Sequence, residues 1–216
     1  MAITTDNREV AKEADVLLLC VKPQVVSTVI AEIKEYVGEE KLIISIVAGK
    51  SIQILQEAFG SPLKIVRTMP NTPALVGEGC TGISFSDKIS DEEKKFVLEL
   101  FNCVGKAEEV PEKLMDAVGG VSGSSPAFVF LFIEAMADGA VAAGMPRKQA
   151  YQFAAQAVLG SAKLMLETGK HPGELKDMVC SPGGTTIAGV KVLEEKGMRA
   201  AVMDAVLEAV EKSKKL

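Results

Sequence analysis

Residues 181–186 have the sequence SPGGTT and stand directly before a segment whose apolar residues have helical spacing. Such small residues leave the backbone N–H groups of a first helical turn bare, and Thr185 and Thr186 add two hydroxyls. Hydrogen bonds and the helix dipole both favour a negative charge at that position. We therefore expect Ser181, Gly183, Gly184 and the two threonines to bind a carboxylate or another small anion.

A phosphate loop is not indicated at this position, because no Gly-Lys-Ser/Thr follows the glycines. The structural alternative is an N-cap followed by a hinge. Gly183 and Gly184 count against that alternative, because a glycine inside a helix costs up to about 1 kcal/mol relative to alanine.

Three further groups of residues stand where predicted strands end. The first strand ends at Val21 and is followed by Lys22 and Pro23, the second is followed by Ala48 and Gly49, and the third by Asn71 and Thr72 within MPNTP. Ligands of open α/β sheets bind at the carboxyl ends of parallel strands, so these endings predict one binding edge. Each ending also has a plain alternative: a solvated lysine, a close backbone approach or a tight turn.

The elements that position these residues alternate in the first half of the chain. Residues 15–21, 41–47 and 63–69 are short apolar runs, typical of parallel strands covered on both faces. Helical spacing separates them, with glycine stops at Gly38 and Gly60, and CTGISFS, residues 80–86, reads as a further strand. A helix follows from the N-cap Ser90 to a stop at Gly105. We predict an α/β fold with a partial Rossmann-type sheet in residues 1–110.

Residues 111–216 show helical patterns only. Proline opens and glycine closes these segments almost without fault, at positions 126 and 144, 146 and 169, and before Gly197. The segment AFVFLFIEAMADGAVAA, residues 127–143, is apolar nearly all round, so its helix must be buried on every side. We predict an all-α dimerisation domain in which a second subunit covers this helix.

Composition excludes several classes of protein. The net charge is −5 and the sequence pI is about 5.1, which argues against nucleic-acid binding. Cys20, Cys80, Cys103 and Cys180 are far apart and only one histidine is present, so neither a metal site nor a disulfide framework is predicted. Glu134 and Asp138 interrupt the most apolar stretch and argue against a membrane span. We expect a cytoplasmic protein.

Two other features favour structural interpretations. The stretch GGVSGSSP, residues 119–126, lies between predicted helices and is read as a flexible break rather than a dinucleotide fingerprint. His171 precedes Pro172 near a predicted helix start, where a structural role is favoured over acid–base chemistry.

Taken together, several segments resemble pyrroline-5-carboxylate reductases along essentially the whole chain. They are DVLLLCVKPQ, VAG, RTMPNTP, DAVGGVSGSSPAFVF, ADGAVAAGMPR and, most specifically, HPGELKDMVCSPGGTTIAGVKVLE. The resemblance implies a Rossmann domain that binds NADPH or NADH and a helical domain that forms a homodimer or a ring of dimers. It also implies reduction of the cyclic imine 1-pyrroline-5-carboxylate to L-proline.

The resemblance assigns roles to individual residues. The Thr186 hydroxyl would bond the ring nitrogen, the amides of Gly183, Gly184 and Thr185 would hold the substrate carboxylate, and Ser181 would line the pocket. The dinucleotide would contact Asn7, Val21, Lys22 and Ala48, with Asn71 and Thr72 near the nicotinamide; Pro23 and Gly49 adjoin these positions.

One departure from the family pattern bears on activity. Family members begin with a strand, a Gly-rich phosphate loop and a further βαβ unit, roughly 30 residues or more, whereas this sequence starts just before Asn7. We expect an exposed first strand, weaker NAD(P)H binding than in a longer relative and impaired activity. The alternative functions are a non-catalytic oligomerisation remnant and another two-domain β-hydroxyacid-dehydrogenase-like reductase.

Overall fold

The structure is a computed structural model that describes residues 3–215. Its chain forms two compact units. One comprises the chain up to Pro126 together with the chain from Val206 onward, and the other is Ala127–Ala205. The boundary predicted between residues 110 and 111 follows the last strand, and as a boundary between folding domains it stays a prediction.

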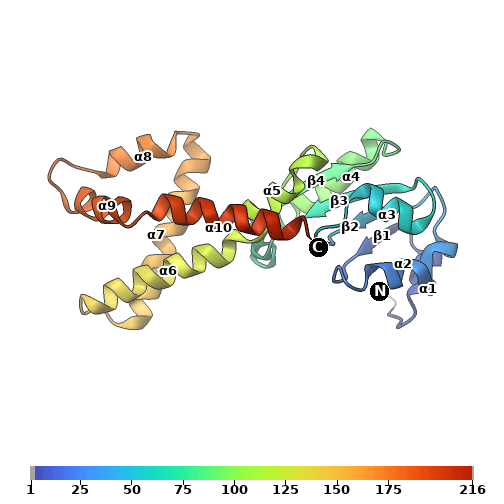
Figure 1. Cartoon of the computed structure of the whole chain (residues 1–216), viewed down its shortest axis with the longest axis horizontal. Helices are drawn as coiled ribbons and strands as arrows, with labels where there is room; N and C mark the ends of the chain where they lie inside the picture. The colour runs from blue at the N-terminus through green and yellow to red at the C-terminus, as the bar shows by residue number, and fades with distance from the viewer. Residues whose placement is uncertain (1–2, 216) are drawn as a thin grey trace. The chain divides into compact units, whose positions relative to one another are not determined.

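The first unit is built on a five-stranded sheet in sequential order, β1-β2-β3-β4-β5 (Figure 1). Its strands are β1 (Val16–Leu19), β2 (Leu42–Ser45), β3 (Lys64–Met69), β4 (Gly79–Phe85) and β5 (Gly105–Glu109). The first three are parallel, β4 runs antiparallel to β3, and β5 runs parallel to β4. The predicted α/β class and its parallel sheet are therefore confirmed.

Helices cover both faces of this sheet. On one face, α1 (Asn7–Glu13), α2 (Val26–Ile33) and α3 (Ile52–Phe59) pack over a core that includes Ile43 and Ile65. On the other, α4 (Asp91–Asn102) packs over Ile44, Val66 and Ile83. Successive residues of β2 thus enter different cores, which explains why its sequence is apolar without alternation.

The first strand departs from the prediction that both of its faces are covered. Within residues 3–215, β1 pairs only with β2, and Leu18 is 49% exposed. Leu17 and Leu19, on the opposite face, are buried in the core with α1 and α2. The apolar run therefore predicted the strand correctly and the coverage of both faces wrongly, whereas the exposed first strand that we expected from the departure from the family pattern is observed.

Gly105 also has a different role from the one expected. The helix α4 ends at Asn102 with Cys103 as its C-cap, and Gly105 begins β5. Its φ of 152° is unfavourable for other residues, and a Cβ there would lie 2.1 Å from the Gly79 carbonyl oxygen. Glycine is needed at this position because β4 and β5 approach closely, not because a helix stops.

A capping box begins α4. The Ser90 hydroxyl accepts from the Glu93 amide at 3.2 Å, and the Glu93 carboxylate accepts from the Ser90 amide at 2.9 Å. Lys64 Nζ lies 2.7 Å from Glu93 Oε1. Burial alone would raise the pKa of Glu93, but the hydrogen bonds from Lys64 and Ser90 outweigh it and hold that pKa below its ordinary value of 4.5.

The variant Glu93→Gln is expected to lower the free energy of unfolding by about 1 kcal/mol at neutral pH. Because the folded-state pKa of Glu93 is depressed, its contribution is complete above the unfolded-state pKa and is lost as the pH falls through the folded-state value. Urea unfolding at a series of pH values measures this, with the exposed neighbour Glu92→Gln as control. A penalty that stays constant into acid would contradict the assignment.

Beyond Pro111 the described chain is entirely helical, as predicted. The longer helices are α6 (Ser125–Ala142), α7 (Arg147–Thr168), α8 (Pro172–Val179), α9 (Thr185–Glu195) and α10 (Met198–Ser213). Gly144, Gly169 and Gly197 all have positive φ, which confirms them as helix stops.

The Gly-rich stretch after β5 is not the flexible break that the sequence suggested. Short turns η3 (Glu112–Leu114), α5 (Met115–Val118) and the π-helical η4 (Gly119–Gly123) lead directly into α6. Gly119 and Gly120 are buried. A Cβ on Gly120 would lie 2.6 Å from Val210 Cγ2 of α10, and a Cβ on Gly119 would lie 3.1 Å from Met69 Cε of β3, so glycine allows close packing at both positions.

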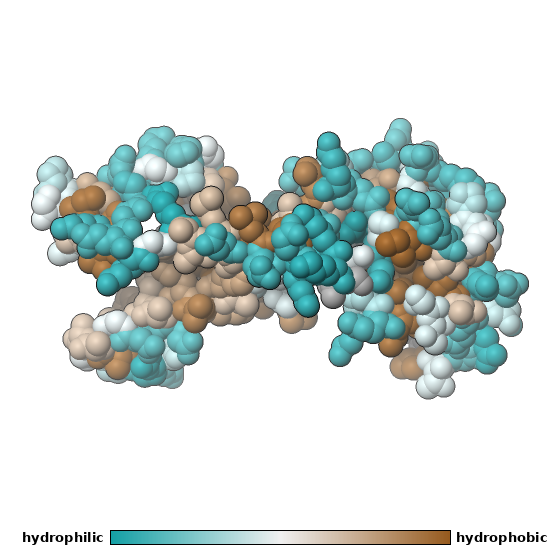
Figure 2. Space-filling model, in the orientation of Figure 1, coloured by the Kyte–Doolittle hydropathy of each residue, from teal (hydrophilic) through white to brown (hydrophobic). Residues whose placement is uncertain are grey.

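The apolar helix α6 is mostly uncovered in the single chain. Among its residues only Ala137 is buried, whereas Phe130 and Leu131 are 64% and 67% exposed. Apolar side chains are visible on the surface of the helical unit (Figure 2). Residues 112–142 are long and apolar enough to cross a membrane by length and composition alone. Burial of α6 against a second subunit remains a prediction.

Candidate functional site

Residues 181–184 form a β-turn between α8 and α9. The Gly184 amide donates to the Ser181 carbonyl at 3.1 Å, Pro182 is the second residue of the turn, and Gly183 has a φ of 69°. A proline followed by a residue with positive φ is the pattern of a type II turn. Neither glycine lies inside α9, so the helical cost that we assigned to Gly183 and Gly184 does not arise.

The amino end of α9 carries no side-chain cap. Its N-cap is Gly184, which has no side chain to accept a hydrogen bond from the first turn. Among the described residues, the amides of Gly183, Thr185 and Thr186 have no protein acceptor within hydrogen-bond distance. Thr186 is half-buried, whereas Thr185 and Ser181 are exposed. The turn therefore presents free donors and hydroxyls together, while the Gly184 amide is used within the turn.

His171 is the N-cap of α8. Its Nδ1 accepts from the Gly173 amide at 3.1 Å, and Pro172 occupies the first helical position. The structural role predicted for His171 is confirmed, and it fixes the helix that leads into the SPGG turn.

The predicted cofactor residues lie in the first unit, mostly where the parallel strands end. The parallel pairing of β1, β2 and β3 places Val21, Lys22 and Pro23, the pair Ala48 and Gly49, and Asn71 and Thr72 after the carboxyl ends of these strands. Lys22 is exposed, and Gly49 has a φ of 73°. Seven of the eight residues predicted to bind the cofactor therefore lie beyond the carboxyl ends of the parallel strands.

Asn7 is the eighth and differs from the rest. It begins α1, and its amide nitrogen donates to Glu32 Oε2 at 3.1 Å. Its side chain therefore joins α1 to α2 in this structure. A role for Asn7 in cofactor binding stays a prediction.

The side chain of Asn71 joins three segments. Its Oδ1 accepts from the Cys80 amide at 2.8 Å and its Nδ2 donates to the Ser122 carbonyl at 3.1 Å. Ser122 Oγ in turn donates to the Cys80 carbonyl at 3.0 Å. The residue thus holds the loop after β3 against β4 and the π-helical segment. Ser122 was not predicted, because the residues to which it is hydrogen-bonded are 42 and 51 positions away in the sequence.

The four cysteines are free thiols, and burial raises the pKa of Cys20, which keeps that thiol neutral near physiological pH. Within residues 3–215, no group of three or more histidine, cysteine or acidic side chains is placed to hold a metal ion.

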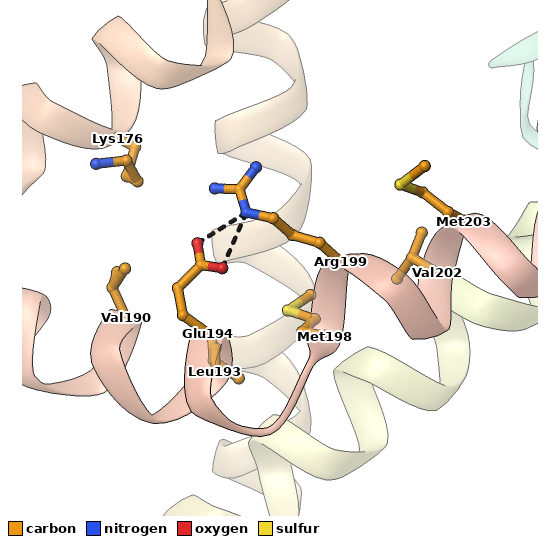
Figure 3. A pocket seen from close by; sticks show the side chains of 8 residues that line it. All are labelled: Lys176, Val190, Leu193, Glu194, Met198, Arg199, Val202 and Met203. Carbon is orange, nitrogen blue, oxygen red and sulfur yellow. Dashed lines mark hydrogen bonds and ion pairs between the residues drawn. The ribbon is translucent and has the colours of Figure 1, made fainter.

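Two apolar grooves lie in the helical unit, and none of the predicted substrate residues lines either of them. One, of about 490 Å³, is formed by α8, α9 and α10. Figure 3 shows Val190, Leu193, Met198, Val202 and Met203 around it, with Arg199 bonded to both carboxylate oxygens of Glu194 at 2.8 and 3.0 Å. The other, of about 590 Å³, lies between α6, α7 and α8. Their apolar lining is typical of surfaces that bind another helix.

Comparison with known proteins finds a family match for each half of the chain. A family model described as pyrroline-5-carboxylate reductase dimerisation matches residues 112–216, and one described as NADP oxidoreductase, coenzyme F420-dependent, matches residues 1–49. The pyrroline-5-carboxylate reductase of Escherichia coli K12 is 55% identical over 97% of this chain and 78% of its own length. That of Methanosarcina acetivorans is 53% identical over 99% of this chain and 79% of its own.

A solved structure is similar in both sequence and fold. The crystal structure of Plasmodium falciparum pyrroline carboxylate reductase with NADP bound has a TM-score of 0.92 and 39% identity, covering 98% of this chain and 80% of that one. The sheet, the helical region and the two matching family models together define the class of protein. It is an oxidoreductase in which a nicotinamide-nucleotide domain is followed by a helical dimerisation region. More specifically, this chain belongs to the pyrroline-5-carboxylate reductase family.

Proposed function

We propose that this protein reduces the C=N bond of 1-pyrroline-5-carboxylate to give L-proline. A hydride equivalent is added to the imine carbon, a proton is added to the ring nitrogen, and NADPH or NADH is oxidised. The reaction is the last step of proline biosynthesis. The observation that carries this proposal is the uncapped amino end of α9 beside the Ser181–Gly184 turn.

The substrate carries one carboxylate, and the donors at α9 suit it. The Gly183 and Thr185 amides have no protein acceptor among the described residues, so both can donate to that carboxylate in the favourable field of the helix end. The Gly184 amide already donates to the Ser181 carbonyl, and the absence of a side chain at Gly184 leaves room for the Ser181 hydroxyl, since a Cβ there would lie 2.3 Å from Ser181 Oγ. The exposed Ser181 hydroxyl adds a polar group beside these donors.

Thr186 is assigned to the ring nitrogen. This half-buried residue lies in the first turn of α9, one position beyond the proposed carboxylate donors. A hydrogen bond from Thr186 Oγ orients the imine and steadies the nitrogen as it gains its proton. Positioning of this kind lowers the entropy cost of bringing the reactants together.

The nicotinamide nucleotide supplies the hydride when bound. We assign its binding to the sheet edge, where Lys22 offers a positive charge and Ala48 and Gly49 leave the backbone open to close approach. The hydrogen bonds of Asn71 hold the loop after β3 in place. This loop also carries Thr72, and we assign both residues to the nicotinamide end of the nucleotide.

The assembly is proposed to be a homodimer or a ring of dimers. Phe130 and Leu131 of α6 and the two apolar grooves leave a large apolar surface uncovered in the single chain, and a second copy of the helical region would cover it. A cytoplasmic location is proposed, because Glu134 and Asp138 make α6 unsuited to a lipid environment. The net charge of −5 disfavours binding to a nucleic acid.

Oxidation of NADPH, followed by absorbance, tests the proposed function directly. We expect turnover that depends on 1-pyrroline-5-carboxylate and yields one L-proline for each nucleotide oxidised. A stable oligomer that forms no proline with either NADPH or NADH would favour the non-catalytic alternative.

A further inference from the structure

Arg67 on β3 lies at the centre of a charged network in the first unit. Its side chain is only 11% exposed. Nη1 lies 3.4 Å from Glu112 Oε1, and Nη2 lies 3.5 Å from Asp116 Oδ1. The planar guanidinium can face two separate carboxylates at once, which a lysine ammonium does less well.

Glu112 also bonds the backbone at the start of α3. Its Oε1 accepts from the Ile52 amide at 2.7 Å, across 60 positions of sequence. The Ser51 hydroxyl accepts from the Ile54 amide at the same helix end, so two donors of the first turn have partners. A carboxylate is favoured at this position by the helix dipole, and Arg67 holds the carboxylate in place.

The segment held in this way adjoins the proposed cofactor loop. Ile52 comes three residues after Gly49 and four after Ala48, and the short loop between β2 and α3 has few ways to move once Ile52 is fixed. The side chain of Glu112 is 34% exposed, while Ile52 is buried. The Glu112 carboxylate therefore fixes the end of this loop that joins α3.

Asp116, the second carboxylate that faces Arg67, connects this network to the C-terminal helix α10. Asp116 Oδ1 accepts from the Ser213 hydroxyl at 2.9 Å, and Ser213 is the last residue of α10. This arm does not touch α3. It therefore provides a matched control that alters the same arginine without removing the bond to Ile52.

We propose that Glu112, held by Arg67, is a positioning residue that orders the loop of residues 47–51 for nicotinamide-nucleotide binding. The inference rests on the proposed function, because it assumes that this loop contacts the nucleotide. Glu112 acts through the Ile52 amide and does not itself touch the nucleotide. Its removal should therefore weaken nucleotide binding more than it changes the affinity for the imine.

The test compares Glu112→Ala, Glu112→Gln and Asp116→Asn in the full chain. Glu112→Ala is expected to raise the Kd for NADPH about tenfold, to speed amide exchange in residues 46–55, and to change the KM for the imine less than about twofold. Glu112→Gln keeps an oxygen that can accept from Ile52 and should restore most of the affinity. Asp116→Asn should leave the Kd for NADPH within about twofold of the unaltered chain.

Three results would overturn the proposal. One is an unchanged Kd for NADPH in Glu112→Ala when amide exchange shows that the loop has loosened. Another is equal weakening of NADPH binding in Asp116→Asn, which would mean a general loss of stability. The third is no measurable NADPH binding by the unaltered chain. If NADPH binds but no imine is reduced, only the proposed reaction fails, and the affinities still decide the role of Glu112.

Discussion

Replacing Thr186 with valine should lower kcat/KM for 1-pyrroline-5-carboxylate by about 100-fold or more, in the range of a lost proton-handling group. Valine keeps the shape of the side chain and removes the hydroxyl proposed to bond the ring nitrogen. Thr186 is half-buried and makes no side-chain hydrogen bond within the described chain that its loss would break. Steady-state kinetics with saturating NADPH measures the effect.

The matched control is Thr185→Val, one residue earlier in the same helical turn. The Thr185 side chain is exposed, and the substitution leaves its backbone amide in place. We expect less than about a threefold change in kcat/KM, and an unchanged oligomeric state for both variants. Equal losses for the two threonines, or no loss for Thr186→Val in an active enzyme, would refute the ring-nitrogen role.

The variant Gly105→Ala should destabilise the sheet unit by about 3 kcal/mol or more. A Cβ at Gly105 would lie 2.1 Å from the Gly79 oxygen and 2.3 Å from the Gly79 nitrogen, both of them backbone atoms that cannot rotate away. Gly79 and Gly105 are register partners in β4 and β5, so the clash separates the two strands. Chemical denaturation gives the change in the free energy of unfolding.

Gly60→Ala separates steric clash from backbone strain. Gly60 ends α3 with a φ of 78°, and a Cβ there would meet nothing within 4 Å. The expected cost is about 1 kcal/mol, because only the left-handed conformation is penalised. If Gly105→Ala cost no more than Gly60→Ala, the close approach of β4 and β5 would not be what requires glycine.

Secondary structure was predicted most reliably where the local residue pattern and the burial of the element indicate the same structure. The run at residues 41–47 is apolar on both faces and became β2, buried throughout, because helices cover both faces of that strand. Ser90 correctly predicted the N-cap of α4, and its hydroxyl accepts from the amide of Glu93, three positions along the chain. Interactions of this range can be read directly from the order of residues.

Features that depend on distant partners were missed. The strand β5 has the sequence GKAEE, which lacks the apolar pattern of a strand, yet it pairs with β4 at the exposed edge of the sheet. The stretch at residues 119–123 reads as a break because helical glycine is unfavourable in isolation. Packing against Met69 and Val210 makes glycine the residue that fits there. In both cases tertiary packing overrides local preference.

The candidate site was predictable in composition but not in detail. The SPGGTT residues do gather in one turn, but their glycines serve the turn geometry, and one amide that we assigned to the substrate is bonded to Ser181. The bonds of Asn71 to Cys80 and Ser122 and of Glu112 to Ile52 span 9 to 60 positions. No spacing rule links residues at such separations.

The position of α10 matters for the design of truncated forms of this protein. The helix begins among the residues of the helical unit, but from Val206 onward it belongs to the unit that contains the sheet. A gene fragment that stops at Pro126 would therefore lack Val210, which covers Gly120, and Ser213, which bonds Asp116. The unit that contains the sheet is discontinuous along the chain, so a shortened protein meant to keep this unit should also include the last turns of α10.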